Sequence, residues 1–299
     1  MTTHIKIKPT PVCCTVYVGA YRGNLMITSV NFTDMTDIGP NAFRGCWNLE
    51  SIDFGSVQEI DEGAFQGCTS LKKVDICRVS ELGNESFAHC TKLNEIIFSS
   101  ALNTIPLRAF NGCYQLSNIT FPFNIKDIRT EAFAHCNLGE FQLPPELEKI
   151  GNRAFYYNHC KRVVIPATVH SIGEDAFGVC RLELVILLGK PTRKLHVDAF
   201  GSNNHIKKFV LPVKAENYVR GRLGFLYGFT SKKMSLADWK AIGMPRPIKH
   251  MIINIILCLR ETQRVDPQKS QPVLPVLPYE LVLIIVSYVD TGYLLLKRP

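Results

Sequence analysis

The chain lacks any apolar run long enough to cross a membrane as a helix. Such a helix needs about 20 consecutive apolar residues, and the longest apolar stretches here, residues 251–259 and 281–286, are much shorter. The first nine residues, MTTHIKIKP, alternate charged and apolar side chains. They lack the apolar core of about 7–15 residues that marks a secretory signal. We therefore expect a cytoplasmic protein with no membrane partner.

The chain also lacks the short motifs that carry common enzyme chemistry. It contains no Gly-x-Gly-x-x-Gly motif, no glycine-rich phosphate-binding loop and no Gly-x-Ser-x-Gly motif. His-Cys pairs occur at residues 89–90, 135–136 and 159–160, but none has the Cys-x2-4-Cys spacing of a structural zinc site. We therefore expect no catalytic residues, no metal site and no cofactor.

Long blocks of one charge are absent as well. Residues 1–212 carry 21 Lys and Arg against 20 Asp and Glu, whereas residues 213–299 carry 13 against 6. The basic residues of the second region are scattered, with no run of five and no interleaved aromatics. Single-stranded nucleic acids bind to basic grooves that also present stacking aromatics, so we expect no nucleic-acid partner.

What the chain does have is a phenylalanine at an almost fixed interval. Eight of them are separated by 22 or 23 residues: Phe43, Phe65, Phe87, Phe110, Phe133, Phe155, Phe177 and Phe200. A repeat of this length is the signature of a solenoid, in which each repeat forms one coil and packs on its neighbours. A degenerate first copy precedes them, with Val16, Ala20, Tyr21, Asn24, Ile27, Val30 and Phe32 in the matching positions.

Other positions repeat in phase with the phenylalanines. A small residue precedes each Phe, an Ile or Leu stands five residues before it, and a short alternating segment such as Leu49, Ile52 and Phe54 follows. We interpret the alternating segment as a strand and the small-Phe pair as a helical or turn segment. Three residues after each Phe stands a Cys or Asn: Cys46, Cys68, Cys90, Cys113, Cys136, Asn158, Cys180 and Asn203.

The pattern Ile-Gly-x-x-Ala-Phe-x-Gly-Cys-x-x-Leu-x-x-Ile-x-Phe, seen in variant form at residues 60–76, resembles the BspA-type subclass of leucine-rich repeats. The resemblance covers about residues 12–212, two thirds of the chain. It implies an α/β repeat solenoid that winds as a right-handed coil. It also implies a binding function, and it brings no catalytic residues with it.

The outward side chains of the predicted strands define a candidate binding face. They are Ser51 and Asp53, Lys73 and Asp75, Glu95 and Ile97, Asn118 and Thr120, Glu140 and Gln142, Arg162 and Val164, Leu184 and Ile186, Lys208 and Val210. We predict contacts to a protein partner through Asp53, Asp75, Ile97, Thr120, Gln142, Val164, Leu184, Ile186 and Val210. The last four form an apolar strip that should be open to a partner unless the C-terminal region folds over it.

The repeat cysteines are predicted to be buried and reduced. A buried thiol acts as a small apolar group and weak donor, so a Cys or Asn in the turn can bond to the neighbouring coil. Stacked coils bring equivalent residues to about 4.7–4.9 Å, within the range that a disulfide tolerates. A cytoplasmic location, however, keeps thiols reduced.

After Pro212 the repeat stops. We divide the chain into a solenoid over residues 1–212, a small helical cap over 213–263, a proline-rich linker over 264–276 and a terminal segment over 277–299. The cap is predicted to contain helices at 235–243 and about 247–261, because a solenoid needs its open end covered. Trp239 and Phe229 are its predicted packing residues.

The terminal segment begins Leu-Pro-Tyr-Glu-Leu and continues with apolar residues at helical spacing. It resembles the first helix of an F-box, which in that family docks on the adaptor subunit of a cullin ubiquitin ligase. A full F-box has about forty residues and usually precedes its repeats, so the match is partial. The alternative is a simple terminal helix packed on the cap. The resemblance makes four residues candidates for adaptor docking: Leu277, Pro278, Leu281 and Ile285.

These observations favour a non-enzymatic, intracellular leucine-rich-repeat scaffold that binds an unidentified protein partner. Two alternatives remain open at this point. One is a substrate receptor of a cullin-type ubiquitin ligase that uses the partial F-box, and the other is a cell-surface or secreted adhesin.

Overall fold

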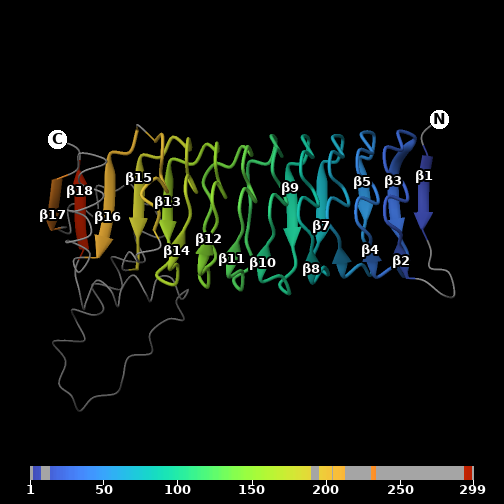
Figure 1. Cartoon of the computed structure of the whole chain (residues 1–299), viewed down its shortest axis with the longest axis horizontal. Coiled ribbons are helices and arrows are strands. Elements are labelled where there is room, and N and C mark those ends of the chain that lie inside the picture. Colours follow the sequence, from blue (N-terminus) through green and yellow to red (C-terminus); the bar gives the residue numbers. More distant parts are fainter. Residues whose placement is uncertain are drawn as a thin grey trace, which may run out of the picture.

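The protein is an elongated stack of coils. A computed structural model describes residues 3–7, 14–189, 195–203, 205–212, 230–233 and 293–297. The strand β1 (Thr3–Ile7) lies at one end of the stack and β16 (Lys208–Pro212) lies near the other (Figure 1). Successive coils lie side by side along the long axis, as the repeat predicts.

The coils build two columns of parallel strands. The long-strand column contains β3 (Ile27–Phe32), β5 (Ser51–Asp53), β7 (Lys73–Ile76), β9 (Glu95–Phe98), β13 (Arg162–Ile165), β15 (Leu184–Leu187) and β16. The short-strand column contains β2 (Thr15–Val16), β4 (Asp37–Ile38), β6 (Glu59–Ile60), β8 (Glu81–Leu82), β10 (Thr104–Ile105), β11 (Asp127–Ile128), β12 (Lys149–Ile150) and β14 (Ser171–Ile172). Equivalent residues pair in register, as in Val74 with Ile96.

The phenylalanines form a continuous stack through the core. Consecutive rings from Tyr21 to Phe200 lie 4.9–5.7 Å apart between centroids and are tilted by at most 14°. Seven of the eight Phe rings are fully buried, and Phe200 is 1% exposed. Aromatic pairs in this geometry contribute about 0.5–1.5 kcal/mol beyond the area they bury. The predicted role of Phe as the core of each coil is confirmed.

The segment around each small-Phe pair is a succession of turns, and no described residue lies in a helix. Two backbone positions explain why. Asn41 and Gly45 have φ of 55° and 72°, and Glu85 and His89 repeat this at 55° and 60°. Such left-handed residues four apart prevent a right-handed helix from continuing. The expected α component of the coils is therefore wrong for the described residues.

The Cys or Asn of each turn bonds to the preceding coil, as predicted. The thiols donate to the carbonyl of the preceding stacked ring residue at 2.9–3.4 Å, as in Cys68 to Phe43. Asn158 donates to the equivalent carbonyl of Phe133 at 2.8 Å, and its Oδ1 also accepts the N–H of Leu138 at 2.9 Å. The amide thus replaces the thiol without loss of the contact between coils.

Prolines interrupt both columns. Just after β15, the N–H of Leu188 donates to the carbonyl of Ile165 in the preceding coil. Pro122, Pro144 and Pro166 occupy the same position in the three coils before it and have no N–H to donate. Residues 118–121 and 140–143 accordingly form no strand, contrary to expectation, although β9 and β13 do on either side (Figure 1). Pro106 stands at the corresponding break between β8 and β10.

The C-terminal edge of the long-strand column continues with antiparallel strands. β18 (Tyr293–Lys297) pairs with β16, and β17 (Thr230–Lys233) pairs with β18. The helical cap has no counterpart among the described residues, and the part of residues 213–263 that is described is the strand β17. The predicted helices at 235–243 and 247–261, and the packing residues Phe229 and Trp239, lie outside the described residues.

No helix with the length and apolarity of a membrane span occurs within the described ranges.

Candidate protein-binding face

The outward side chains of the long-strand column form a face, here called the strand face. Asp53 on β5, Asp75 on β7 and Ile97 on β9 are exposed, while the residues between them point into the core. Thr120 and Gln142 are exposed at the equivalent positions of the two coils without strands. The structure thus places these five predicted residues on one surface.

Polar contacts between neighbouring coils fix the side chains of this face. Asn31 donates to Asp53 at 2.7 Å, and Lys73 pairs with Glu95 at 2.7 Å. Asp53 and Asp75 also accept backbone N–H groups two residues further on, at 3.1 and 3.2 Å. Such local bonds hold a carboxylate in one direction. Exposed ion pairs add little stability, so these contacts matter chiefly because they order the surface.

The far end of the strand face differs from the expectation. Val164 is half-buried, and Leu184, Ile186 and Val210 are 7%, 1% and 0% exposed. Most of this strip is therefore covered, which is one of the two outcomes that the sequence left open. Outward apolar side chains of β15 and β16 are taken out of water in the folded chain, where the five-stranded sheet β13-β15-β16-β18-β17 continues past the last coil. Burial of apolar side chains stabilises the fold.

A hollow of about 660 Å³ lies where β3, β5 and β7 end. Its lining includes Asp34, Asp53, Asp75 and Arg78, so it is polar and carries both signs of charge. It borders the part of the strand face that carries the exposed residues Asp53, Asp75, Ile97, Thr120 and Gln142, here called the open half.

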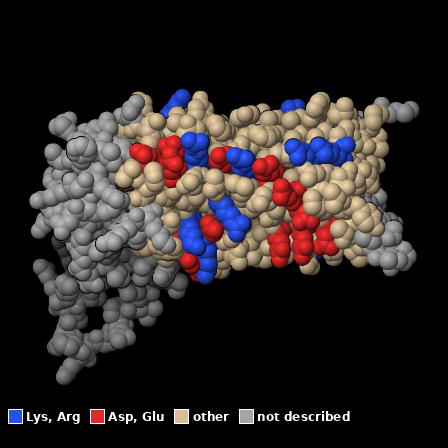
Figure 2. Space-filling model, in the orientation of Figure 1, with Lys and Arg blue, Asp and Glu red and all other residues tan. Residues whose placement is uncertain are grey.

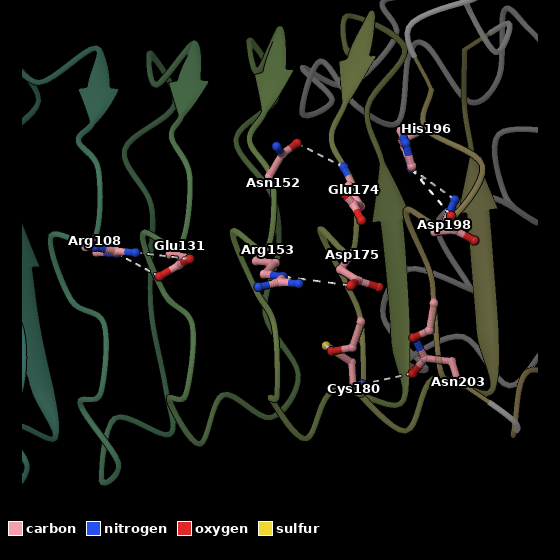
Figure 3. Close-up of polar contacts among 12 residues, drawn as sticks. Arg108, Glu131, Asn152, Arg153, Glu174, Asp175, Cys180, His196, Asp198 and Asn203 are labelled. Carbon is pink, nitrogen blue, oxygen red and sulfur yellow. Dashed lines mark hydrogen bonds and ion pairs between the residues drawn. The ribbon is translucent and has the colours of Figure 1, made fainter.

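The turns carry charges that are compensated within the chain. Arg108 pairs with Glu131 at 2.7 Å and with Glu85 at 3.5 Å, and Arg153 lies 3.8 Å from Asp175 (Figure 3). The hydrogen bond to Glu131 is the main cause that raises the pKa of Arg108. Because neighbouring coils already satisfy these charges, the turns are a weaker candidate for partner binding than the strand face.

Acidic side chains gather over the part of the short-strand column that contains β4, β6 and β8 (Figure 2). Asp37, Glu59 and Glu81 pair in register there. Repulsion from Asp37 raises the pKa of Glu59, and desolvation raises that of Asp61. Like charges at directly opposed positions destabilise a sheet, and this surface repels acidic partners.

The buried thiols of the turns are poorly reactive near neutral pH. Burial raises the pKa of the Cys90 and Cys136 thiols to about 12, so they stay protonated near neutral pH. All six repeat cysteines are buried and free, as predicted, and Cys160 is buried too, at a position where other coils carry Leu. Across the described ranges, no three His, Cys, Asp or Glu side chains form a group that could hold a metal ion.

Sequence reasoning missed one exposed aromatic residue beside the strand face. It passed over Phe123, which is 64% exposed beside the strand face. The sequence does contain a signal for this region, because Pro122 and Pro144 mark the coils in which the strand ladder is interrupted. The adaptor-docking candidates Leu277, Pro278, Leu281 and Ile285 lie outside the described residues.

Comparisons with known proteins agree with the geometry of the coils. A family model described as a BspA type leucine-rich repeat region matches residues 15–139 and 126–220. A leucine-rich repeat protein from Bacteroides ovatus has a similar crystal structure, with a TM-score of 0.54 and 24% identity over 69% of this chain. This likeness shows the fold alone, and the chain covers 63% of that protein, less than two thirds of its length.

A leucine rich cell surface protein from Faecalibacterium prausnitzii is also similar, with a TM-score of 0.38 and 20% identity over 69% of this chain and 72% of that one. No curated protein sequence matches the chain.

Proposed function

We propose that this chain, which belongs to the BspA type leucine-rich repeat family, is a non-enzymatic scaffold that binds a protein partner on the open half of its strand face. The observation that carries the proposal is the row of exposed residues Asp53, Asp75, Ile97, Thr120 and Gln142 on successive coils. Residues presented from a stacked backbone lose little conformational entropy on binding, which favours affinity.

The form of the face supports a macromolecular partner. Its hollows are open to solvent and run along several coils. Small molecules are usually bound in concave pockets that bury most of the ligand. A protein surface or an extended peptide, in contrast, can contact several coils together and use the regular spacing of the column.

Affinity capture with a charge-reversed face tests the proposal. The full chain and the Asp75→Arg variant are used as bait in extracts of cells that express the chain, and the bound proteins are quantified by mass spectrometry. We expect Asp75→Arg to lose proteins that the control Glu62→Arg retains, since Glu62 is exposed outside the strand face. Equal capture by both variants contradicts the proposal.

An intracellular location is part of this proposal. Imaging of a tagged full-length chain in its own cells tests it. A signal at the cell surface would favour the adhesin alternative.

The ubiquitin-ligase alternative rests on the resemblance of residues 277–289 to an F-box helix. Its test is direct binding of the full chain to a purified cullin adaptor. Burial of two such apolar side chains contributes about 3–6 kcal/mol, so Leu281→Ala with Ile285→Ala should weaken binding by at least about a hundredfold. Absence of binding by the unmutated chain at micromolar concentration excludes this alternative.

A further inference from the structure

Two neighbouring hollows in the middle of the strand face form what we call the central groove. One has a volume of about 660 Å³ and the other about 670 Å³, and they share Ile119, Thr120 and Phe121. The groove therefore runs along both sides of a single segment of one coil. The side chains that matter for its chemistry are Glu95, Ile97, Phe121, Phe123, Glu140, Phe141 and Glu146.

The backbone at the groove is unusual in having free peptide groups. The N–H and C=O groups of residues 118–121 and 140–143 make no hydrogen bond with any described residue. The prolines at 122, 144 and 166 contribute to this loss, because each lacks the N–H that would donate to the carbonyl of the preceding coil.

The groove also exposes apolar surface. Phe123 is 64% exposed and Ile97 is 38% exposed. Phe121 and Phe141 are half-buried and meet edge to face at 6.4 Å between centroids. Aromatic side chains at the centre of an interface commonly contribute much of its binding energy.

The charge of the groove has one sign. Its lining contains three carboxylates and no Lys or Arg. Glu95 and Glu140 are already paired with cations outside the lining, Lys73 at 2.7 Å and Arg162 at 3.0 Å. Glu146 is exposed and forms no ion pair with any described residue. A bound Lys or Arg therefore meets one uncompensated carboxylate at the rim of the groove.

The hollow at the ends of β3, β5 and β7 lacks this combination. It carries Arg78 as well as carboxylates, and none of the large apolar residues exposed on the surface lines it. The central groove alone among these hollows joins an exposed aromatic ring, free peptide groups and a negative charge.

We propose that the central groove binds an extended peptide segment of a partner protein that carries apolar side chains and a Lys or Arg. The inference rests on the proposed function and narrows it to one segment of the strand face and one kind of partner. The apolar side chains pack on Phe121, Phe123 and Ile97, and the cation meets Glu146.

The probe is a display library of random 12-residue peptides, selected on the immobilised full chain, with the affinities of enriched peptides measured by fluorescence polarisation. We expect enrichment of peptides that combine aliphatic or aromatic residues with Lys or Arg. Phe123→Ser should weaken their binding by about tenfold or more. Glu146→Gln should weaken it by about threefold and reduce its dependence on salt.

Tyr114→Ser is the matched control, because Tyr114 is 58% exposed in the same coil but lies outside the groove. It should leave the affinity unchanged. Failure to enrich any peptide, or equal binding by Phe123→Ser and the unmutated chain, overturns the inference. Peptides that respond to Asp75→Arg but not to Phe123→Ser overturn it while leaving the proposed function intact.

Light scattering of the unmutated chain and of Phe123→Ser distinguishes another occupant. A dimer that dissociates in the variant shows that a second copy fills the groove, which also overturns the inference. The result expected here is the same mass for both chains.

Discussion

The two halves of the strand face share one backbone and differ in their surface. Over β5, β7 and β9 the outward residues are exposed, and Ile97 has 38% of its surface open to solvent. Over β15 and β16 the outward residues Leu184, Ile186 and Val210 are apolar, and Ile186, at the same position of its coil as Ile97, is 1% exposed. A repeat therefore specifies the coil but not whether a given coil presents a surface or contributes to a core.

The largest effect is expected when the two isoleucines are compared directly. Ile186→Asp removes a buried apolar side chain and buries a carboxylate without a partner, so it should lower the free energy of unfolding by about 3–6 kcal/mol. Ile97→Asp, on the exposed half, should change it by no more than about 0.5 kcal/mol. Denaturant unfolding of both variants measures the difference, and equal losses contradict a divided face.

The phenylalanine stack should behave alike in both halves. Phe65→Ala and Phe177→Ala each remove a fully buried ring that is stacked on both sides. Each should cost about 3–5 kcal/mol, because neighbouring coils cannot refill the space. Phe123→Ala is the control, since its exposed ring should contribute less than about 1 kcal/mol. A much smaller cost in one half would show that the halves differ in their cores and not only on their faces.

The thiols provide a test that depends on pH. Burial raises the pKa of Cys90 and Cys136 to about 12 in the folded chain, whereas an unfolded thiol titrates near about 8.5. Between these values the unfolded chain loses its thiol protons first, so stability falls as pH rises. The slope is about 1.4 kcal/mol per pH unit for each thiol.

Denaturant unfolding at about pH 8 and about pH 10.5 measures this slope, and Cys90→Ala with Cys136→Ala should reduce it. The cysteines of this ladder lie mainly in the open half, because Asn158 and Asn203 replace two of them further along. Alkaline pH should therefore loosen the N-terminal coils first, as hydrogen exchange can show. An unchanged slope in the double variant would mean that these thiols are not buried in solution.

The smallest effect concerns a buried hydroxyl in the open half. Ser86 is fully buried and its Oγ has no hydrogen-bond partner among the described residues, whereas the other seven clear coils carry Ala at this position. An unsatisfied buried polar group is costly, so Ser86→Ala should raise the free energy of unfolding by about 1 kcal/mol. The reverse change, Ala132→Ser, should lower it by a similar amount. Thermal unfolding of the two variants checks both signs.

The core of the fold could be predicted because each coil repeats it. The spacing of the phenylalanines predicted the stack of rings. The recurring Cys or Asn predicted the hydrogen bonds between coils. The turns could not be told from helices, because the decisive feature is a positive φ at residues such as Glu85 and His89. Unlike Gly, these residue types do not indicate a left-handed backbone.

The candidate site was only partly predictable. Alternation along the strands located Asp53, Asp75 and Ile97 correctly on the open face. It gave the same outward direction to Leu184 and Ile186, but alternation within one strand says nothing of what packs on it from elsewhere. The missing strands at residues 118–121 and 140–143 follow from prolines that recur every 22 residues, a signal that stands in the sequence itself.

Thiol labelling at the two isoleucine positions tests the divided face most directly. Ile97→Cys and Ile186→Cys are treated with an alkylating reagent under native conditions, and peptide mass spectrometry follows labelling at each introduced cysteine. The account predicts rapid labelling at residue 97 and labelling at residue 186 only after addition of denaturant. Similar native rates at both positions would contradict the claim that one repeat backbone presents a surface in one half and a covered core in the other.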